Sequence, residues 1–249
     1  YKQHLMSLPS PLREMLLYGD FSAGQVDSEY QVIPSKWVND AMDRWEEKPL
    51  TNLTAIGVDP SRGGLDETTI APRSGNHFHS LITLPGEEAP TGKEVVAKIL
   101  PLLEKNACPV LIDVIGVGSA VYDTLELYIG TQAIGINVAE KADKAAKDWG
   151  GQIGFANKRA QYWWELREAL NPDHGNPISL PPDNKLRAEL CAPIYELTAS
   201  GIKVESKDKV RKRLGRSTDR ADAIILANIQ RSNFNSGFSS PFKVIRSNV

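Results

Sequence analysis

The chain has 249 residues, 41% of them hydrophobic and 24% charged, with a net charge of −2 and an isoelectric point near 6.1. This length and composition fit one large folded domain and give no overall sign of the basic surface that is typical of nucleic-acid binders. No run of about 20 apolar residues and no basic-then-apolar N-terminus occurs, which argues against a membrane span or a secretory signal and predicts a cytoplasmic protein. The two cysteines, Cys108 and Cys191, lie far apart and belong to no C-x-x-C pair, so we expect buried free thiols.

The first 50 residues combine turn signals with a helical pattern over 35–47, and we interpret residues 1–50 as a linker that follows another part of a longer polypeptide. Three apolar segments, 53–58, 68–72 and 77–84, then predict strands, with Gly75-Asn76 as the turn between the second and the third. A helix over 91–104, a very apolar strand over 110–114, a helix over 119–128 and a strand over 133–138 are expected next. The pattern therefore predicts three antiparallel strands followed by a β-α-β unit with parallel strands.

The second half of the sequence is mostly helical. A charged loop over 140–151 precedes an amphipathic helix over 155–170, which ends at the stop signal Asn-Pro-Asp-His-Gly over 171–175. We then expect a short strand over 178–180, a helix over 183–191, a hairpin around Ser200-Gly201 and a last helix over 218–229. The order of elements predicts an α/β domain over residues 51–232, with a mixed five-stranded sheet flanked by helices, and a flexible tail over 233–249.

Acidic residues stand where a metal site could form. Asp59 and Asp113 each end an apolar strand, and their carboxylates meet at one edge of the sheet if the two strands are adjacent and parallel. An aspartate after a strand is otherwise a common turn or cap residue. Asp219 and Asp222 share one face at the start of the last helix; the helix dipole explains Asp219 but not Asp222, which has small and apolar neighbours. Several converging carboxylates are what two hard divalent cations require in phosphodiester hydrolysis.

The segments 57–59, 112–118 and 217–223 resemble, in order and context, the three nuclease motifs of phage large terminases. The resemblance covers about residues 53–229, and the segment 17–21 is similar to the connection that follows a terminase ATPase domain. It implies an RNase H-like fold and an endonuclease that cuts double-stranded DNA with two Mg²⁺ or Mn²⁺ ions during genome packaging. By position, it makes Asp59, Asp113 and Asp222 catalytic metal ligands, Asp219 a further ligand and Asp66 an accessory residue. The small terminase subunit and the portal protein become the expected partners.

A run of basic residues leads directly into the helix of Asp219. It consists of Lys207, Lys209, Arg211, Lys212, Arg213 and Arg216. Alone, such a run is typical of a solvated helix face, but next to the acidic residues it predicts contacts to DNA phosphates without reading of bases. Lys158 and Arg159 form a second possible phosphate contact, with a solvated helix start as the alternative.

Two other interpretations stay open. Gly116 and Gly118 follow an apolar strand and resemble part of a G-x-G-x-x-G dinucleotide fingerprint, although the last glycine is missing and Asp113 would face the pyrophosphate. A non-catalytic RNase H-like packaging or interaction module would keep the fold without the chemistry, but retention of all three acids argues against it. The sequence has no G-x-x-x-x-G-K-[ST] motif, so ATP hydrolysis is not expected of this chain.

Overall fold

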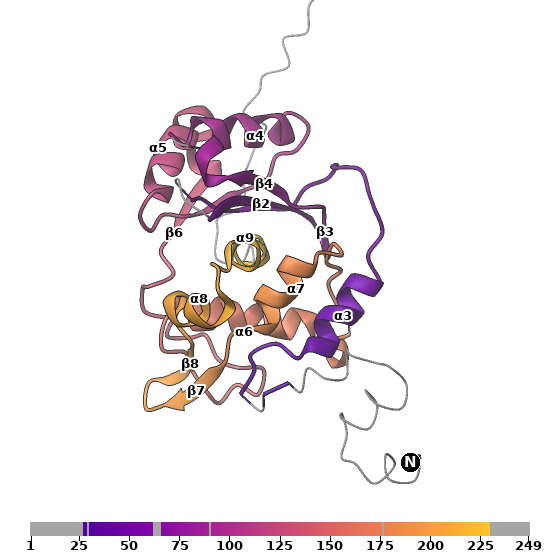
Figure 1. Ribbon diagram of the computed structural model, residues 1–249, viewed down its shortest axis with the longest axis vertical. Helices are drawn as coiled ribbons and strands as arrows, with labels where there is room; N and C mark the ends of the chain where they lie inside the picture. Colours follow the sequence, from indigo (N-terminus) through magenta and orange to yellow (C-terminus); the bar gives the residue numbers. More distant parts are fainter. Residues whose placement is uncertain (1–26, 29, 62–65, 90, 176, 230–249) are drawn as a thin grey trace, which may run out of the picture.

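A mixed β-sheet crosses the middle of the computed structural model, with helices on both of its faces (Figure 1). The structure describes residues 27–28, 30–61, 66–89, 91–175 and 177–229. The tail predicted over 233–249 and the first half of the predicted linker lie outside these residues. Within them, no helix combines the length and the apolar character that a membrane crossing requires.

The sheet has the predicted arrangement of antiparallel strands followed by parallel ones. Its strands are β1 (Ala55–Asp59), β2 (Glu67–Ser74), β3 (His77–Phe78), β4 (Ile82–Pro85), β5 (Val110–Asp113) and β6 (Ala133–Ile136). Their order is β3-β2-β1-β5-β6, and β4 pairs with β2 beside β3. Strand β1 pairs antiparallel with β2 and parallel with β5, and β5 pairs parallel with β6. Strands β1 and β5 are almost entirely buried, which explains their continuous apolar sequences.

The third predicted strand, over 77–84, is interrupted. Strand β3 pairs with the end of β2 at Arg73 and Ser74, whereas β4 pairs with its beginning, from Glu67 to Ile70. Between them lies Pro72, which has no N–H to donate to a neighbouring strand. Only the carbonyl of Pro72 bonds there, accepting a hydrogen bond from the backbone of His79 at 2.9 Å. The predicted strand therefore forms two shorter strands, β3 and β4, which both pair with β2.

Two layers of helices cover the sheet (Figure 1). Helices α4 (Lys93–Leu103) and α5 (Gly118–Ile129) lie on one face, where their apolar side chains join one core cluster with β1 and β5. Helix α9 (Asp219–Asn228) lies on the other face against β1, β2 and β5. Helices α6 (Lys158–Leu170) and α7 (Asn184–Cys191) pack against α9. Helix α3 (Ser35–Asp43) packs against α6 and α7, and the four helices contribute to a second core cluster.

Helix α9 sits unusually close to the sheet because β1 carries a glycine beneath it. A Cβ atom at Gly57 would lie 2.1 Å from the carbonyl oxygen of Ala223 and 2.5 Å from the backbone nitrogen of Ala227. Any larger side chain would thus displace backbone atoms of α9. This close approach fixes the height of α9 above β1, and with it the position of the acidic residues in the first turn of the helix.

A hairpin and one further helix lie in the lower part of Figure 1. A hairpin of β7 (Tyr195–Thr198) and β8 (Gly201–Val204) matches the prediction around Ser200-Gly201. The basic run folds as a separate helix, α8 (Lys207–Leu214), which begins at the cap Ser206 and ends at Gly215 with φ of 80°. Short 3₁₀ turns occur at Gly86–Glu88, Gly130–Gln132 and Pro172–His174.

Candidate metal centre

Asp59 and Asp113 lie side by side at one edge of the sheet. Strands β1 and β5 pair in parallel, with Val58 opposite Ile112, so the next residue of each strand is an aspartate at the same level. Asp59 is buried, and Asp113 is partly buried with its carboxylate accepting a hydrogen bond from the backbone of Ile115 at 3.0 Å. The sequence prediction that these residues occupy neighbouring parallel strands is confirmed.

Helix α9 brings two more carboxylates to the same edge. Asp219 and Asp222 lie in its first turn, and both are buried. The Asp222 carboxylate accepts a hydrogen bond from the Thr218 hydroxyl at 2.8 Å, and Asp219 accepts one from the backbone of Glu67 at 3.2 Å. The predicted helix facing both strand ends is therefore present.

The ammonium group of Lys207 lies among these carboxylates. Its Nζ atom is 2.9 Å from Asp59, 3.0 Å from Asp222 and 3.3 Å from Asp219. Three carboxylate oxygens contact the same nitrogen atom. The distance between any two of these oxygens is therefore at most twice the longest of the three N···O distances. Asp59, Asp113, Asp222 and Lys207 also line one cavity of about 320 Å³. A cation thus occupies the point on which the carboxylates converge.

This crowding of negative charge alters proton affinities. Burial raises the pKa of Asp59 well above its usual range, an effect to which Asp222 and Asp219 add and which Lys207 opposes. Burial also raises the pKa of Asp113. For Asp222, burial acts in the same direction, but the charges of Lys207 and Arg159 outweigh it and hold the pKa below its ordinary value. Burial acts to lower the pKa of Lys207, but the carboxylates raise it well above its usual value, so the lysine is charged.

The donor set suits a hard divalent cation. Four carboxylates meet at one edge of the sheet, and Lys207 and the guanidinium of Arg159, 3.2 Å from Asp222, supply two positive charges against them. Carboxylate oxygens are the ligands that Mg²⁺ and Mn²⁺ prefer. In the described parts of the chain, no three acidic, histidine or cysteine side chains are already arranged around a metal position. The ammonium of Lys207 is the stand-in cation around which three of these carboxylates, those of Asp59, Asp219 and Asp222, are grouped.

Glu189 of α7 supports the first turn of α9 and was not predicted from the sequence. Thr218, the residue before the helix, makes no side-chain cap. Instead, one oxygen of the buried Glu189 carboxylate accepts hydrogen bonds from the backbone of Arg220 at 2.9 Å and of Ala221 at 3.1 Å. A carboxylate at a helix N-terminus is favoured by the helix dipole. Glu189 therefore anchors the turn that carries Asp219 and Asp222.

The predicted DNA-contacting residues divide into groups. Lys207 and Arg159 point to the carboxylates and not to an outer surface. Several others form ion pairs with acidic residues: Lys158 with Glu140, Arg211 with Asp66, Arg213 with Glu205, and Arg216 with Glu189. Lys209 and Lys212 are exposed, and neither has an ion pair within the described residues. For these two lysines, contact with DNA phosphates stays a prediction.

The structure explains the positions of Asp66 and of the two glycines, Gly116 and Gly118, that resemble part of a dinucleotide fingerprint. The side chain of Asp66 pairs with Arg211 at 3.2 Å and is not part of the carboxylate group around Lys207. A Cβ atom at Gly118 would lie 1.7 Å from the carbonyl oxygen of Asp113, so this glycine lets α5 begin directly against the end of β5. Gly116 has φ of 69°, which favours glycine in the same turn. Both glycines are thus explained by the turn, without a dinucleotide.

No family model matches the sequence, and no curated protein does. Solved structures match the fold. The nuclease domain of the large terminase subunit gp2 of bacterial virus Sf6 is 20% identical, with a TM-score of 0.59 over 79% of this chain and 97% of that one. The large terminase nuclease of thermophilic phage G20c, with bound cobalt, is 18% identical, with a TM-score of 0.52 over 82% of this chain and 98% of that one. The same nuclease has also been solved with bound magnesium, at 20% identity and a TM-score of 0.50 over 74% of this chain and 84% of that one. This chain therefore has the RNase H-like fold of the nuclease domains of phage large terminase subunits.

Proposed function

We propose that this chain is a divalent-metal-dependent endonuclease that cuts double-stranded DNA, with Asp59, Asp113 and Asp222 as ligands of two Mg²⁺ or Mn²⁺ ions and Asp219 as a further ligand. The observation that carries the proposal is the convergence of carboxylates from β1 and α9 on the single cation of Lys207. The fold supports it, because the Sf6 nuclease domain has been solved with manganese and the G20c nuclease with magnesium.

The balance of charge also supports a divalent cation. Four aspartates face the two cationic groups of Lys207 and Arg159, which leaves a surplus of negative charge when all four are ionised. Burial is the main cause of the raised pKa of Asp59, and the negative charges of Asp222 and Asp219 raise it further. Buried carboxylates without compensating charge are costly, and a bound divalent cation removes the cost. When bound, such ions supply activated water and stabilise the leaving oxygen of the phosphodiester.

The residues of the chain itself hold this arrangement. The backbone of Ile115 orients the carboxylate of Asp113, and Thr218 and Arg159 orient that of Asp222. Lys207 keeps three mutually repelling carboxylates together. Exposed Lys209 and Lys212, on the outer side of α8, then supply cations for the phosphates of a DNA backbone.

A plasmid-nicking assay tests the catalytic proposal. We expect cleavage with Mg²⁺ or Mn²⁺, none in EDTA and little with Ca²⁺, whose looser coordination positions the attacking water poorly. Asp59→Asn, Asp113→Asn and Asp222→Asn should each abolish cleavage, and Asp219→Asn should reduce it less. Asp173→Asn, at an exposed position in a turn, is the matched control and should cleave as the parent does.

Two results would contradict the proposal. Undiminished cleavage in EDTA would remove the metal requirement, and full activity of Asp222→Asn would remove the ligand assignment. Loss of activity counts only where the variant keeps its melting temperature to within a few degrees and still binds DNA. If the parent binds DNA but cuts none with any of these metals, the non-catalytic RNase H-like module becomes the better interpretation.

DNA binding is proposed to follow the phosphate backbone and not the base sequence. Unrelated duplexes should therefore bind with similar affinity at one salt concentration, and the affinity should fall steeply with salt. A double variant, Lys209→Glu with Lys212→Glu, should weaken all duplexes alike, as measured by fluorescence anisotropy. A variant at the paired residue Lys158 should have a smaller effect. As in a terminase, the small subunit and the portal protein are the proposed partners in the host cytoplasm.

A further inference from the structure

A second cavity lies away from the metal centre. It has a volume of about 500 Å³, within the usual range of ligand pockets, and it shares no lining residue with the cavity of Asp59 and Asp222. Arg73, in its wall, pairs with Ala55 in the sheet, whereas Asp59 pairs with Thr69. Four residues along a strand correspond to about 13 Å, so the two cavities are at opposite ends of β1 and β2.

Exposed and buried aromatic rings line this cavity. The side chain of Trp149 is 70% exposed, which is rare for so large an apolar group, and its ring stacks on His174 at 3.7 Å between centroids. Trp164 also contributes to the wall, and its buried indole N–H has no hydrogen-bond partner among the described residues. An exposed tryptophan at the rim of a pocket is typical of a binding site.

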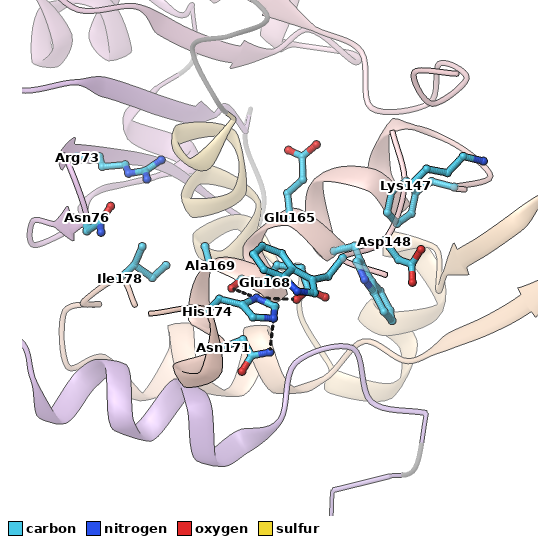
Figure 2. Close-up of a pocket in the computed structure, with 13 residues that line it drawn as sticks. Arg73, Asn76, Lys147, Asp148, Glu165, Glu168, Ala169, Asn171, His174 and Ile178 are labelled. Atoms are coloured by element: carbon cyan, nitrogen blue, oxygen red, sulfur yellow. Dashed lines mark hydrogen bonds and ion pairs between the residues drawn. The ribbon is translucent and has the colours of Figure 1, made fainter. Parts of the chain in front are cut away.

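One carboxylate in the wall has no counter-charge. Glu165 is half-buried and accepts a hydrogen bond from Gln161 at 2.9 Å, but no Lys, Arg or His in the described residues forms an ion pair with it. Burial raises its pKa, and Asp143 raises it further. Figure 2 shows Glu165 extending from α6, between Arg73 and Asn76 on one side and Lys147 on the other. A half-buried carboxylate that is paired with no cation can still form charge-assisted hydrogen bonds with a cationic ligand.

Apart from Lys147, the other charged groups around the cavity are already engaged in hydrogen bonds or ion pairs. Glu168 pairs with His174 at 3.1 Å. Asp148 accepts hydrogen bonds from the backbone of Gln152 and Ile153 at 2.9 and 2.6 Å. Arg73 donates to the carbonyl oxygens of Gly75 and Ala227. Glu165 is therefore the carboxylate that is left for a ligand, although Lys147 at the rim limits the negative potential there.

We infer that this cavity binds the guanidinium group of an arginine side chain from a basic segment of a partner protein. A guanidinium is planar, so it stacks on an aromatic ring such as Trp149 and donates two parallel hydrogen bonds to a carboxylate such as Glu165. The carboxylates in the wall disfavour a phosphate-rich ligand such as DNA. This inference is independent of the nuclease proposal, since it uses none of the residues of the metal centre.

An NMR titration of the full chain tests the inference. The chain has 5 tryptophans, so an indole N–H spectrum is simple, and a Trp149→Phe variant assigns the signal of Trp149. The probes are acetyl-Ala-Arg-Ala-amide and the same peptide with citrulline, which keeps the shape of arginine without its charge. We expect the arginine peptide to shift the Trp149 signal with a dissociation constant on the order of 1 mM and the citrulline peptide to bind about tenfold more weakly.

Glu165→Gln should weaken binding of the arginine peptide by about tenfold, because it removes the charge and keeps the shape. Glu104→Gln, at an exposed position after α4, is the matched control and should bind as the parent does. Equal binding of the two peptides, or unchanged binding by Glu165→Gln, would overturn the inference. A Trp149 signal that does not shift with up to about 10 mM arginine peptide would also overturn the inference. That result would include the case in which an arginine of this chain already fills the cavity. Shifts of the Trp149 signal with duplex DNA instead of the peptide would also contradict it.

Discussion

Replacing Lys207 by methionine tests whether its ammonium occupies the place of a metal ion. The substitution keeps the apolar stem of the side chain and removes the charge that touches Asp59, Asp219 and Asp222 at 2.9, 3.3 and 3.0 Å. Without metal, three carboxylates would then face one another with only Arg159 close to Asp222. We expect Lys207→Met to be less stable than the parent in EDTA and to recover that stability when Mn²⁺ is added.

The size of the expected loss of stability depends on how exposed the side chain of Lys207 is. Removing one partner of a fully buried ion pair costs about 3 to 5 kcal/mol. The side chain of Lys207 is 35% exposed, and Asp59 already holds its proton more tightly than an ordinary aspartate, so part of the cost is relieved by solvent and by protonation. We therefore expect a loss of about 1 to 3 kcal/mol in EDTA, which corresponds to a fall in melting temperature of roughly 3 to 10 °C for a domain of this size.

Metal binding should reduce the difference in stability between the two proteins. In the parent, an incoming ion competes with the ammonium of Lys207, and in Lys207→Met it does not. A metal at one hundred times its dissociation constant stabilises the folded state by about 2.7 kcal/mol. Thermal melts in EDTA and with Mn²⁺, together with calorimetric titration of Mn²⁺, should show a larger increase in melting temperature and tighter binding for the variant.

Lys209→Met is the control for this experiment, because Lys209 is exposed on the same helix and touches none of the carboxylates. It should melt as the parent does under both conditions. Equal melting temperatures for Lys207→Met and the parent in EDTA, with equal increases on addition of Mn²⁺, would refute the idea that the ammonium and the metal share one place.

Two further predictions concern the support of α9. Gly57→Ala should lower the free energy of unfolding by about 1 to 3 kcal/mol and should also reduce nicking activity. The new methyl group would meet backbone atoms of α9 at 2.1 and 2.5 Å and lift Asp222 away from Asp59. Gly75→Ala, in a turn with open space around it, is the control and should alter stability at most. Burial raises the pKa of Glu189 to about 7, so between its usual value and pH 7 the folded state keeps a proton that the unfolded state has lost, and stability falls as pH rises. Chemical denaturation at pH 5 and pH 8 should therefore show a smaller loss for Glu189→Gln, which has no such ionisation, than for the parent; equal losses would contradict this assignment.

Much of the fold was predictable because local patterns and tertiary structure agree. The short continuous apolar segments that became β1 and β5 are typical of buried strands, and each ends at an aspartate. That pattern also predicted that Asp59 and Asp113 would share a sheet edge, and parallel pairing places them there. The interrupted strand at 79–81 was missed, although Pro72 in its neighbour is a signal that could have predicted the interruption.

The interior of the site was less predictable, because its contacts join residues that are distant in sequence. The basic run was interpreted as one surface, whereas its first residue, Lys207, turns inward to Asp59, which lies 148 positions earlier in the chain. Arg159 likewise turns to Asp222 across 63 positions. A charge pattern along one helix shows which residues share a face, but it does not show what that face meets. Glu189, an acid within an ordinary amphipathic helix, gave no signal at all.

The position of α9 links the stability of the domain to the geometry of the proposed metal centre. The helix is held by three independent contacts: its close approach to Gly57, the Glu189 carboxylate at its first backbone N–H groups, and the ion pair of Arg220 with Glu67 at 2.5 Å. Each acts on the turn that carries Asp219 and Asp222 or on the helix behind it, yet none of them touches the cation of Lys207. Because ligands must be held to within a fraction of an ångström, loosening any one of these contacts should weaken metal binding before it unfolds the domain. Residues that do not contact the metal, such as Gly57, Glu189 and Glu67, should therefore influence its affinity. In their variants, we expect the metal affinity to fall by more than the decrease in folding stability alone explains.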